Sequence, residues 1–133
     1  MDNKKSNRIR LFTSLPLVIL SAAIVIASHQ PHIELPDFNI MSFDKVLHLG
    51  AYFVWGAFFI ISYLGNSSKP EKSQAVKYLL ILGLLFGISD EVHQFFIPGR
   101  SCDAFDLIAD MLGILISTSF YGIIKKYLFS QDK

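Results

Sequence analysis

Four long apolar runs constrain the fold of this chain more than any other feature of its sequence. They cover residues 11–28, 46–64, 78–97 and 104–124, and each is close to the length of about 20 residues that a helix needs to cross a bilayer. A backbone in lipid must satisfy its own hydrogen bonds, so four such runs predict four helices. The expected fold is therefore all-α: a polytopic membrane protein with four transmembrane helices in one domain over residues 1–133.

Composition favours the same class and excludes several functions. Hydrophobic residues make up 52% of the chain and charged residues 17%, a balance typical of membrane proteins. The net charge is only +1, and no basic stripe carries interleaved aromatic residues, so nucleic acid is not an expected partner. The single cysteine, Cys102, excludes an intramolecular disulfide and every multi-cysteine metal motif, and we expect it to fill a small-residue position in a turn.

Lysine and arginine alternate between the loops, which predicts the orientation. They gather in the N-terminal tail, the second loop and the C-terminal tail: Lys4, Lys5, Arg8, Arg10, Lys69, Lys72, Lys77, Lys125, Lys126 and Lys133. The first loop holds none before Lys45, and the third holds only Arg100. Cytoplasmic loops carry the excess of positive charge, so both termini are expected in the cytoplasm.

The first apolar run has a second interpretation, because a basic segment before an apolar run also describes a signal peptide. Its length exceeds a usual signal-peptide core, and Ala27-Ser28-His29 is a poor cleavage site. We therefore expect an uncleaved first helix.

Ionisable residues interrupt the outer ends of the last three runs. They fall on one face of each expected helix: Lys45, His48 and Tyr52 on the second, Glu91 and Gln94 on the third, Arg100 after it, and Asp103, Asp106 and Asp110 on the fourth. Polar groups at membrane depth are costly and are functional candidates. Three polar faces at matching depths predict one outward-facing pocket between helices two to four.

Counting along the helices gives the expected neighbours within this pocket. At a rise of about 1.5 Å per residue, Glu91 and Asp110 should face each other roughly two turns below the turn at residues 98–99. Gln94 and Asp106 should meet one turn above them. Two acids this close cannot both stay ionised and unpaired at low cost, so we expect at least one to be protonated, bound to a cation, or paired with Arg100 or His48.

The same residues resemble the VanZ-like family of small bacterial membrane proteins. The resemblance covers residues 44–113 and rests on Asp44-Lys45 followed by His48 and Tyr52, Glu91-x-x-Gln94, Pro98-Gly99-Arg100, and Asp103-x-x-Asp106-x-x-x-Asp110-x-x-Gly113. Two departures are Asp110, where this family often has Asn, and Cys102. The resemblance implies a multi-pass protein of the bacterial cytoplasmic (inner) membrane with a role in the cell envelope.

The family name comes from an accessory protein linked to resistance against teicoplanin, a lipid-tailed glycopeptide antibiotic. The resemblance supplies no settled reaction, and it does not imply glycopeptide resistance for this chain, because function depends on the site and not on the fold.

The first functional hypothesis is capture of a membrane lipid, or of a lipid-linked or cell-wall molecule, by its polar head group. Arg100 would clamp a phosphate or carboxylate with its planar fork, and Lys45 would add charge at the mouth. The remaining expected ligand-binding residues are Tyr52, Gln94, Asp103 and Asp110.

The second hypothesis is a membrane-embedded hydrolase or transferase with Glu91, His48 and Asp106 as catalytic residues. His48, with Glu91 or Asp110 nearby, would act as general acid or base. A divalent cation held by Asp103, Asp106 and Glu91 is a variant, although no motif such as His-Glu-x-x-His specifies a metal or cofactor.

The third hypothesis is structural, with the polar groups only holding the helices together. Asp44 or Ser101 would cap a helix, Asp103 would lie in a first turn, and Arg100 would pair with Asp103 or Asp106. Asp90 and His93 lie one position off the polar face and are expected to be peripheral. Ion conduction is disfavoured, because the inner halves of the runs offer no ionisable relay.

Overall fold

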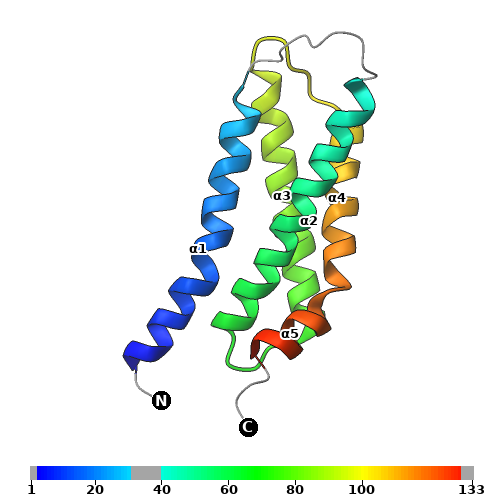
Figure 1. Ribbon diagram of the computed structural model, residues 1–133. Helices are drawn as coiled ribbons and strands as arrows, with labels where there is room; N and C mark the ends of the chain where they lie inside the picture. The colour runs from blue at the N-terminus through cyan, green and yellow to red at the C-terminus, as the bar shows by residue number, and fades with distance from the viewer. Residues whose placement is uncertain (1–2, 31–39, 130–133) are drawn as a thin grey trace.

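The structure is a computed structural model that describes residues 3–30 and 40–129, and these residues form helices joined by short connections (Figure 1). The helices are α1 (Asn3–Ser28), α2 (Ile40–Asn66), α3 (Lys72–Phe95), α4 (Ala104–Thr118) and α5 (Tyr121–Phe129). The described residues contain no strand, so the all-α class is confirmed.

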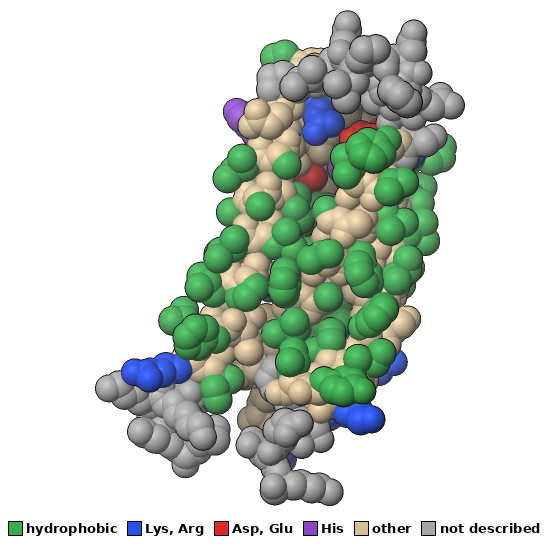
Figure 2. All heavy atoms as spheres, in the orientation of Figure 1, with side chains coloured by type: hydrophobic (Ala, Val, Ile, Leu, Met, Phe, Trp, Pro, Cys, Tyr) green, Lys and Arg blue, Asp and Glu red, His purple; other side chains and the backbone are tan. Residues whose placement is uncertain are grey.

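Length and surface agree with a membrane protein. Arg8–Ser28 and Phe43–Asn66 are long and apolar enough to cross a bilayer, and α4 with α5 adds a third candidate if the bent pair is one span. Large hydrophobic side chains are exposed along the sides of the bundle (Figure 2). A soluble monomer rarely exposes such an extensive apolar surface.

The two ends of the bundle differ in charge. The start of α1 and helix α5 lie at one end, whereas the α3–α4 turn lies at the other (Figure 1). In Figure 2 lysine and arginine side chains appear at both ends, whereas the acidic and histidine side chains that this face shows lie near the second end. The polar residues singled out in the sequence belong to the second end.

The fourth apolar run is not one helix, so the expected continuous helix over 104–124 is wrong. Helix α4 ends at Thr118, and α5 continues at an angle of 48°. The hydroxyls of Ser117 and Thr118 each donate to the carbonyl three residues earlier, at 2.7 Å. Such hydroxyl bonds compete with the backbone ladder and bend helices.

Helices α2 and α4 form the most extensive helix pair, and a glycine permits their close approach. A Cβ at Gly113 would collide with the Leu49 carbonyl oxygen and would lie 2.8 Å from the Phe53 nitrogen. Both are backbone atoms, which cannot move aside cheaply. Small residues have this role in membrane helix pairs generally.

Hydrogen bonds between side chains fasten α1 to α2. The Trp55 indole donates to the Ser21 hydroxyl at 2.9 Å, and the Ser14 and Ser62 hydroxyls lie 3.0 Å apart. These contacts hold α1 beside the middle of α2 and beside the part of α2 far from the polar end.

We expect Gly113→Ala to destabilise the bundle, because the added methyl group must push α2 and α4 apart. Overpacking of this kind costs about 1–3 kcal/mol. The control is Gly50→Ala on α2, since a Cβ at residue 50 meets no atom within 4 Å among the described residues. Thermal unfolding in detergent should show a lower midpoint for Gly113→Ala and an unchanged or higher one for Gly50→Ala. Equal midpoints would contradict this packing.

Candidate functional site

The polar residues of α2, α3 and α4 converge at the end of the bundle that holds the α3–α4 turn. Most of them are buried: His48, Asp90, Glu91, Gln94, Asp106 and Asp110. Residues far apart in the sequence thus form one cluster, as the helical spacing predicted.

Lys45 joins α2 to two acids of the neighbouring segment. Its Nζ lies 2.7 Å from Asp103 Oδ2 and 3.0 Å from Asp106 Oδ1. The Lys45 ammonium, together with the backbone N–H of Phe105, holds the pKa of the Asp103 carboxyl below its usual range. Lys45 therefore neutralises neighbouring acids and does not stand free at the mouth.

Asp103 has a structural role as the N-cap of α4. Its Oδ1 accepts from the Phe105 N–H at 2.8 Å, and its own N–H donates to Glu91 Oε2 at 2.8 Å. The expected cap by Asp44 or Ser101 is wrong, because α2 already begins at Ile40 and the N-cap of α4 is Asp103.

A buried pair of His48 and Asp110 lies deeper in the cluster. His48 Nδ1 is 2.9 Å from Asp110 Oδ1. A ring nitrogen of His48 and one carboxylate oxygen each of Glu91 and Asp110 all lie within 4.8 Å of one another. The prediction that Glu91 and Asp110 face each other, with a base pairing one of them, is confirmed.

One expected pair, Gln94 and Asp106, has other hydrogen-bond partners. Gln94 donates to Asp90 at 3.4 Å, whereas Asp106 accepts from Lys45. The described residues show no hydrogen bond between Gln94 and Asp106, and Gln94 instead lines the cavity with residues of α1 and α2.

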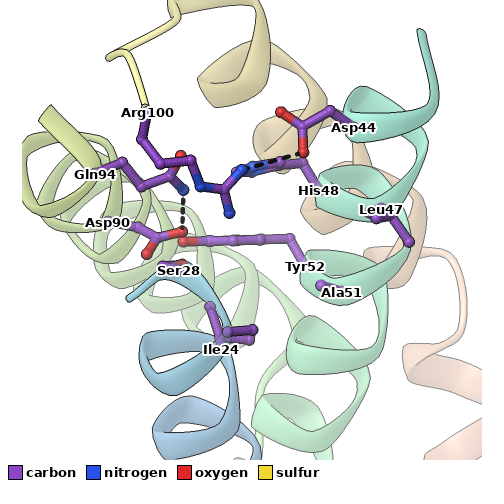
Figure 3. A pocket seen from close by; sticks show the side chains of 11 residues that line it. Ile24, Ser28, Asp44, Leu47, His48, Ala51, Tyr52, Asp90, Gln94 and Arg100 are labelled. Carbon is purple, nitrogen blue, oxygen red and sulfur yellow. Dashed lines mark hydrogen bonds and ion pairs between the residues drawn. The ribbon is translucent and has the colours of Figure 1, made fainter. Parts of the chain in front are cut away.

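A cavity of about 130 Å³ lies beside this cluster (Figure 3). It is lined by Ile24, Ala27 and Ser28 of α1, Asp44, Leu47, His48, Ala51 and Tyr52 of α2, Asp90 and Gln94 of α3, and Arg100. The pocket was expected between helices two to four, yet α1 forms one wall and α4 contributes no lining residue. Two of the lining residues are acids, Asp44 of α2 and Asp90 of α3, and Asp90 was expected to be peripheral.

Asp90 is buried and lines the cavity, so its expected peripheral position is wrong. The sequence held a signal for this, since Asp90 and Gln94 are four residues apart and share a helix face. His93 does lie at the edge, where its Nε2 is 3.2 Å from His29 Nδ1.

Arg100 reaches over the cavity from the α3–α4 turn (Figure 3). Gly99 makes this turn with a φ of 78°, a conformation that favours glycine. Arg100 Nη1 lies 3.6 Å from Asp44 Oδ1, so the expected pairing with Asp103 or Asp106 is wrong. The guanidinium thus stays at the cavity wall.

Three polar atoms of the cavity wall are buried without a hydrogen-bond partner among residues 3–30 and 40–129. They are Tyr52 Oη, Asp90 Oδ1 and Arg100 Nε. A buried polar atom without a partner costs about 1–3 kcal/mol and calls for an explanation. A ligand that bonds to these atoms is one such explanation.

One sequence comparison identifies the family of the chain. The model of the VanZ/LLP1 family matches residues 2–125, which include every helix bearing on the site. The chain belongs to the VanZ/LLP1 family. The comparisons with curated proteins and with solved structures found no match. The family match extends beyond residues 44–113, on which the resemblance in the sequence rested.

Proposed function

We propose that this VanZ-family chain crosses the bacterial cytoplasmic membrane four times, with both termini in the cytoplasm. Four spans require α3 and the bent α4–α5 pair each to cross, in addition to α1 and α2. The start of α1, which carries Arg8 and Arg10, and helix α5, which carries Lys125 and Lys126, lie at the end away from the cavity (Figure 1), as the excess of positive charge on cytoplasmic segments requires. The cavity then opens toward the extracytoplasmic side.

Cys102 tests this orientation, because it is the only cysteine and is exposed in the α3–α4 turn. An impermeant maleimide applied to cells with an intact cytoplasmic membrane should label it. The matched control is Ser68→Cys in a Cys102→Ser background, which moves the thiol to the exposed α2–α3 loop. That control should react only after the membrane is opened. The reverse pattern would reject the orientation.

We further propose that the cavity binds the polar head group of an envelope lipid or of a lipid-linked molecule. The observation that carries this proposal is the group of unpartnered polar atoms on Tyr52, Asp90 and Arg100, which line one cavity. A head group would supply their missing hydrogen bonds. The apolar wall formed by Ile24, Leu47 and Ala51 suits the adjoining part of a lipid.

The charges around the cavity suit a head group with both an acceptor and a donor. Arg100 offers nitrogen donors to a phosphate or carboxylate, and Asp90 offers an acceptor to a hydroxyl or amine. Acids nearby would otherwise repel an anion, but Lys45 already holds Asp103 and Asp106. Arg100 is paired only loosely with Asp44, at 3.6 Å, so it can engage a ligand.

Loss of the Arg100 guanidinium should release the bound lipid. Native mass spectrometry of the protein purified in mild detergent should detect a phosphate-bearing lipid on the wild type. Arg100→Ala should retain about tenfold less, because hydrogen bonds to charged groups contribute about 1.5–3 kcal/mol. Lys126→Ala, which removes an exposed cation at the other end, should retain the wild-type amount. Equal retention in both variants, or no lipid on the wild type, would contradict head-group capture.

Catalysis by a membrane-embedded hydrolase or transferase is a second candidate function. The observation that favours it is the buried His48–Asp110 pair, at 2.9 Å, with Glu91 beside it. A carboxylate orients an imidazole for proton transfer. His48 also lines the cavity, so the pair lies next to the proposed head group.

A further inference from the structure

Three buried side chains from three helices meet at one depth of the bundle. They are His48 of α2, Glu91 of α3 and Asp110 of α4, which are 8%, 3% and 0% exposed. Each offers one atom that could bind a metal ion, a ring nitrogen of His48 or a carboxylate oxygen of Glu91 or Asp110. These three atoms all lie within 4.8 Å of one another. One imidazole and two carboxylates thus surround a single point.

Both carboxylates keep an oxygen that is not used by the fold. Glu91 Oε1 and Asp110 Oδ2 are buried and have no hydrogen-bond partner within residues 3–30 and 40–129. Asp110 Oδ2 points toward α3, where a Cβ at Gly87 would lie 3.1 Å from it. Gly87 is one helical turn from Glu91, so both unpartnered oxygens lie between α3 and α4.

The charges of this group are not balanced by the nearby cations. Lys45 bonds to Asp103 and Asp106, and Arg100 lies against Asp44. Glu91 accepts a backbone N–H bond from Asp103, but among the described residues only His48 remains as a cationic partner for Glu91 and Asp110. Buried carboxylates without compensation are costly, and a bound cation would remove that cost.

We propose that His48, Glu91 and Asp110 bind one divalent metal ion of the Zn²⁺ or Mn²⁺ class. Imidazole favours Zn²⁺, and carboxylate oxygens are accepted by both ions. Adjacent ligand atoms at about 2.1 Å from one ion lie about 3.0 Å apart in octahedral and about 3.4 Å apart in tetrahedral coordination. His48 Nδ1 and Asp110 Oδ1 are 2.9 Å apart, so the ion would take the place of the proton between them.

A second group of potential ligands, Asp44, His48 and Asp106, is less suited to a metal ion. Asp106 accepts a 3.0 Å bond from Lys45, and Asp44 faces Arg100. An ion there would lie against two cationic side chains. Within the described part of the chain, the group of His48, Glu91 and Asp110 forms no ion pair with a lysine or arginine.

The metal site does not depend on the head-group proposal, but the two sites would lie next to each other. Three protein ligands leave a coordination position for water or for a ligand oxygen. Of the three ligands only His48 also lines the cavity, so the ion would lie behind the cavity wall that His48 forms.

Metal titration of the purified full-length protein tests the proposal. After treatment with a chelator, isothermal titration with Zn²⁺ and with Mn²⁺ should show saturable binding of one ion per chain. His48→Gln and Glu91→Gln should each weaken the binding of the preferred ion at least tenfold. The matched control is Glu71→Gln, which removes an exposed carboxylate at the far end of α3 and should leave the affinity within about threefold. No saturable binding, or equal weakening by Glu71→Gln, would overturn the proposal.

Two further readouts keep the result clear if a variant fails to fold. X-ray absorption at the metal edge of the wild-type protein should reveal one imidazole among oxygen ligands, whereas oxygen ligands alone would overturn the proposed site. Lipid retention measured on the same samples separates the two proposals. Arg100→Ala should lose lipid and keep the metal, so that failure of either proposal can be recognised without the other.

Discussion

Carboxylates buried within an otherwise apolar bundle are the constraint on which the cluster's structure depends. Asp90, Glu91, Asp106 and Asp110 are at most 4% exposed, and each would be costly there without a partner. Most polar contacts at this end serve them: Lys45 holds Asp106, His48 holds Asp110, and the Asp103 N–H bonds to Glu91. The N-cap of α4 is thus also part of the site, since one residue starts the helix and satisfies an acid of α3.

These short contacts require the helices to be close. Gly113 lets α4 approach the backbone of α2, and Gly87 leaves room for the Asp110 carboxylate against α3. The glycines therefore connect the packing of the bundle to the chemistry of its polar end. Contacts among hydroxyls and the Trp55 indole hold α1 against α2, and that placement closes the cavity on its apolar side.

Helical spacing predicted which residues would meet where the connection is short. The turn at residues 98–99 fixes the relative depth of α3 and α4, so the approach of Glu91 to Asp110 followed from counting. The contribution of α1 to the cavity did not follow from counting, because its residues at the cavity, such as Ser28, carry no charge pattern that links them to the cluster. The partner of Arg100 could not be predicted either, because the position of Arg100 depends on the turn made by Gly99 and not on helical periodicity. The break after Thr118 was not predicted, because hydropathy does not report hydrogen bonds from hydroxyl groups to backbone carbonyls.

The central claim is that the buried acids serve a function and do more than hold the helices together. The most direct measurement is complementation of the envelope phenotype of a gene deletion by Glu91→Gln, with thermal unfolding in detergent as the folding control. Glu71→Gln makes the same change at the exposed start of α3 and should complement fully. Glu91→Gln should fold with a melting temperature near that of the wild type and fail to complement. Full complementation by Glu91→Gln, or failure only because the protein unfolds, would contradict the claim and leave a structural role.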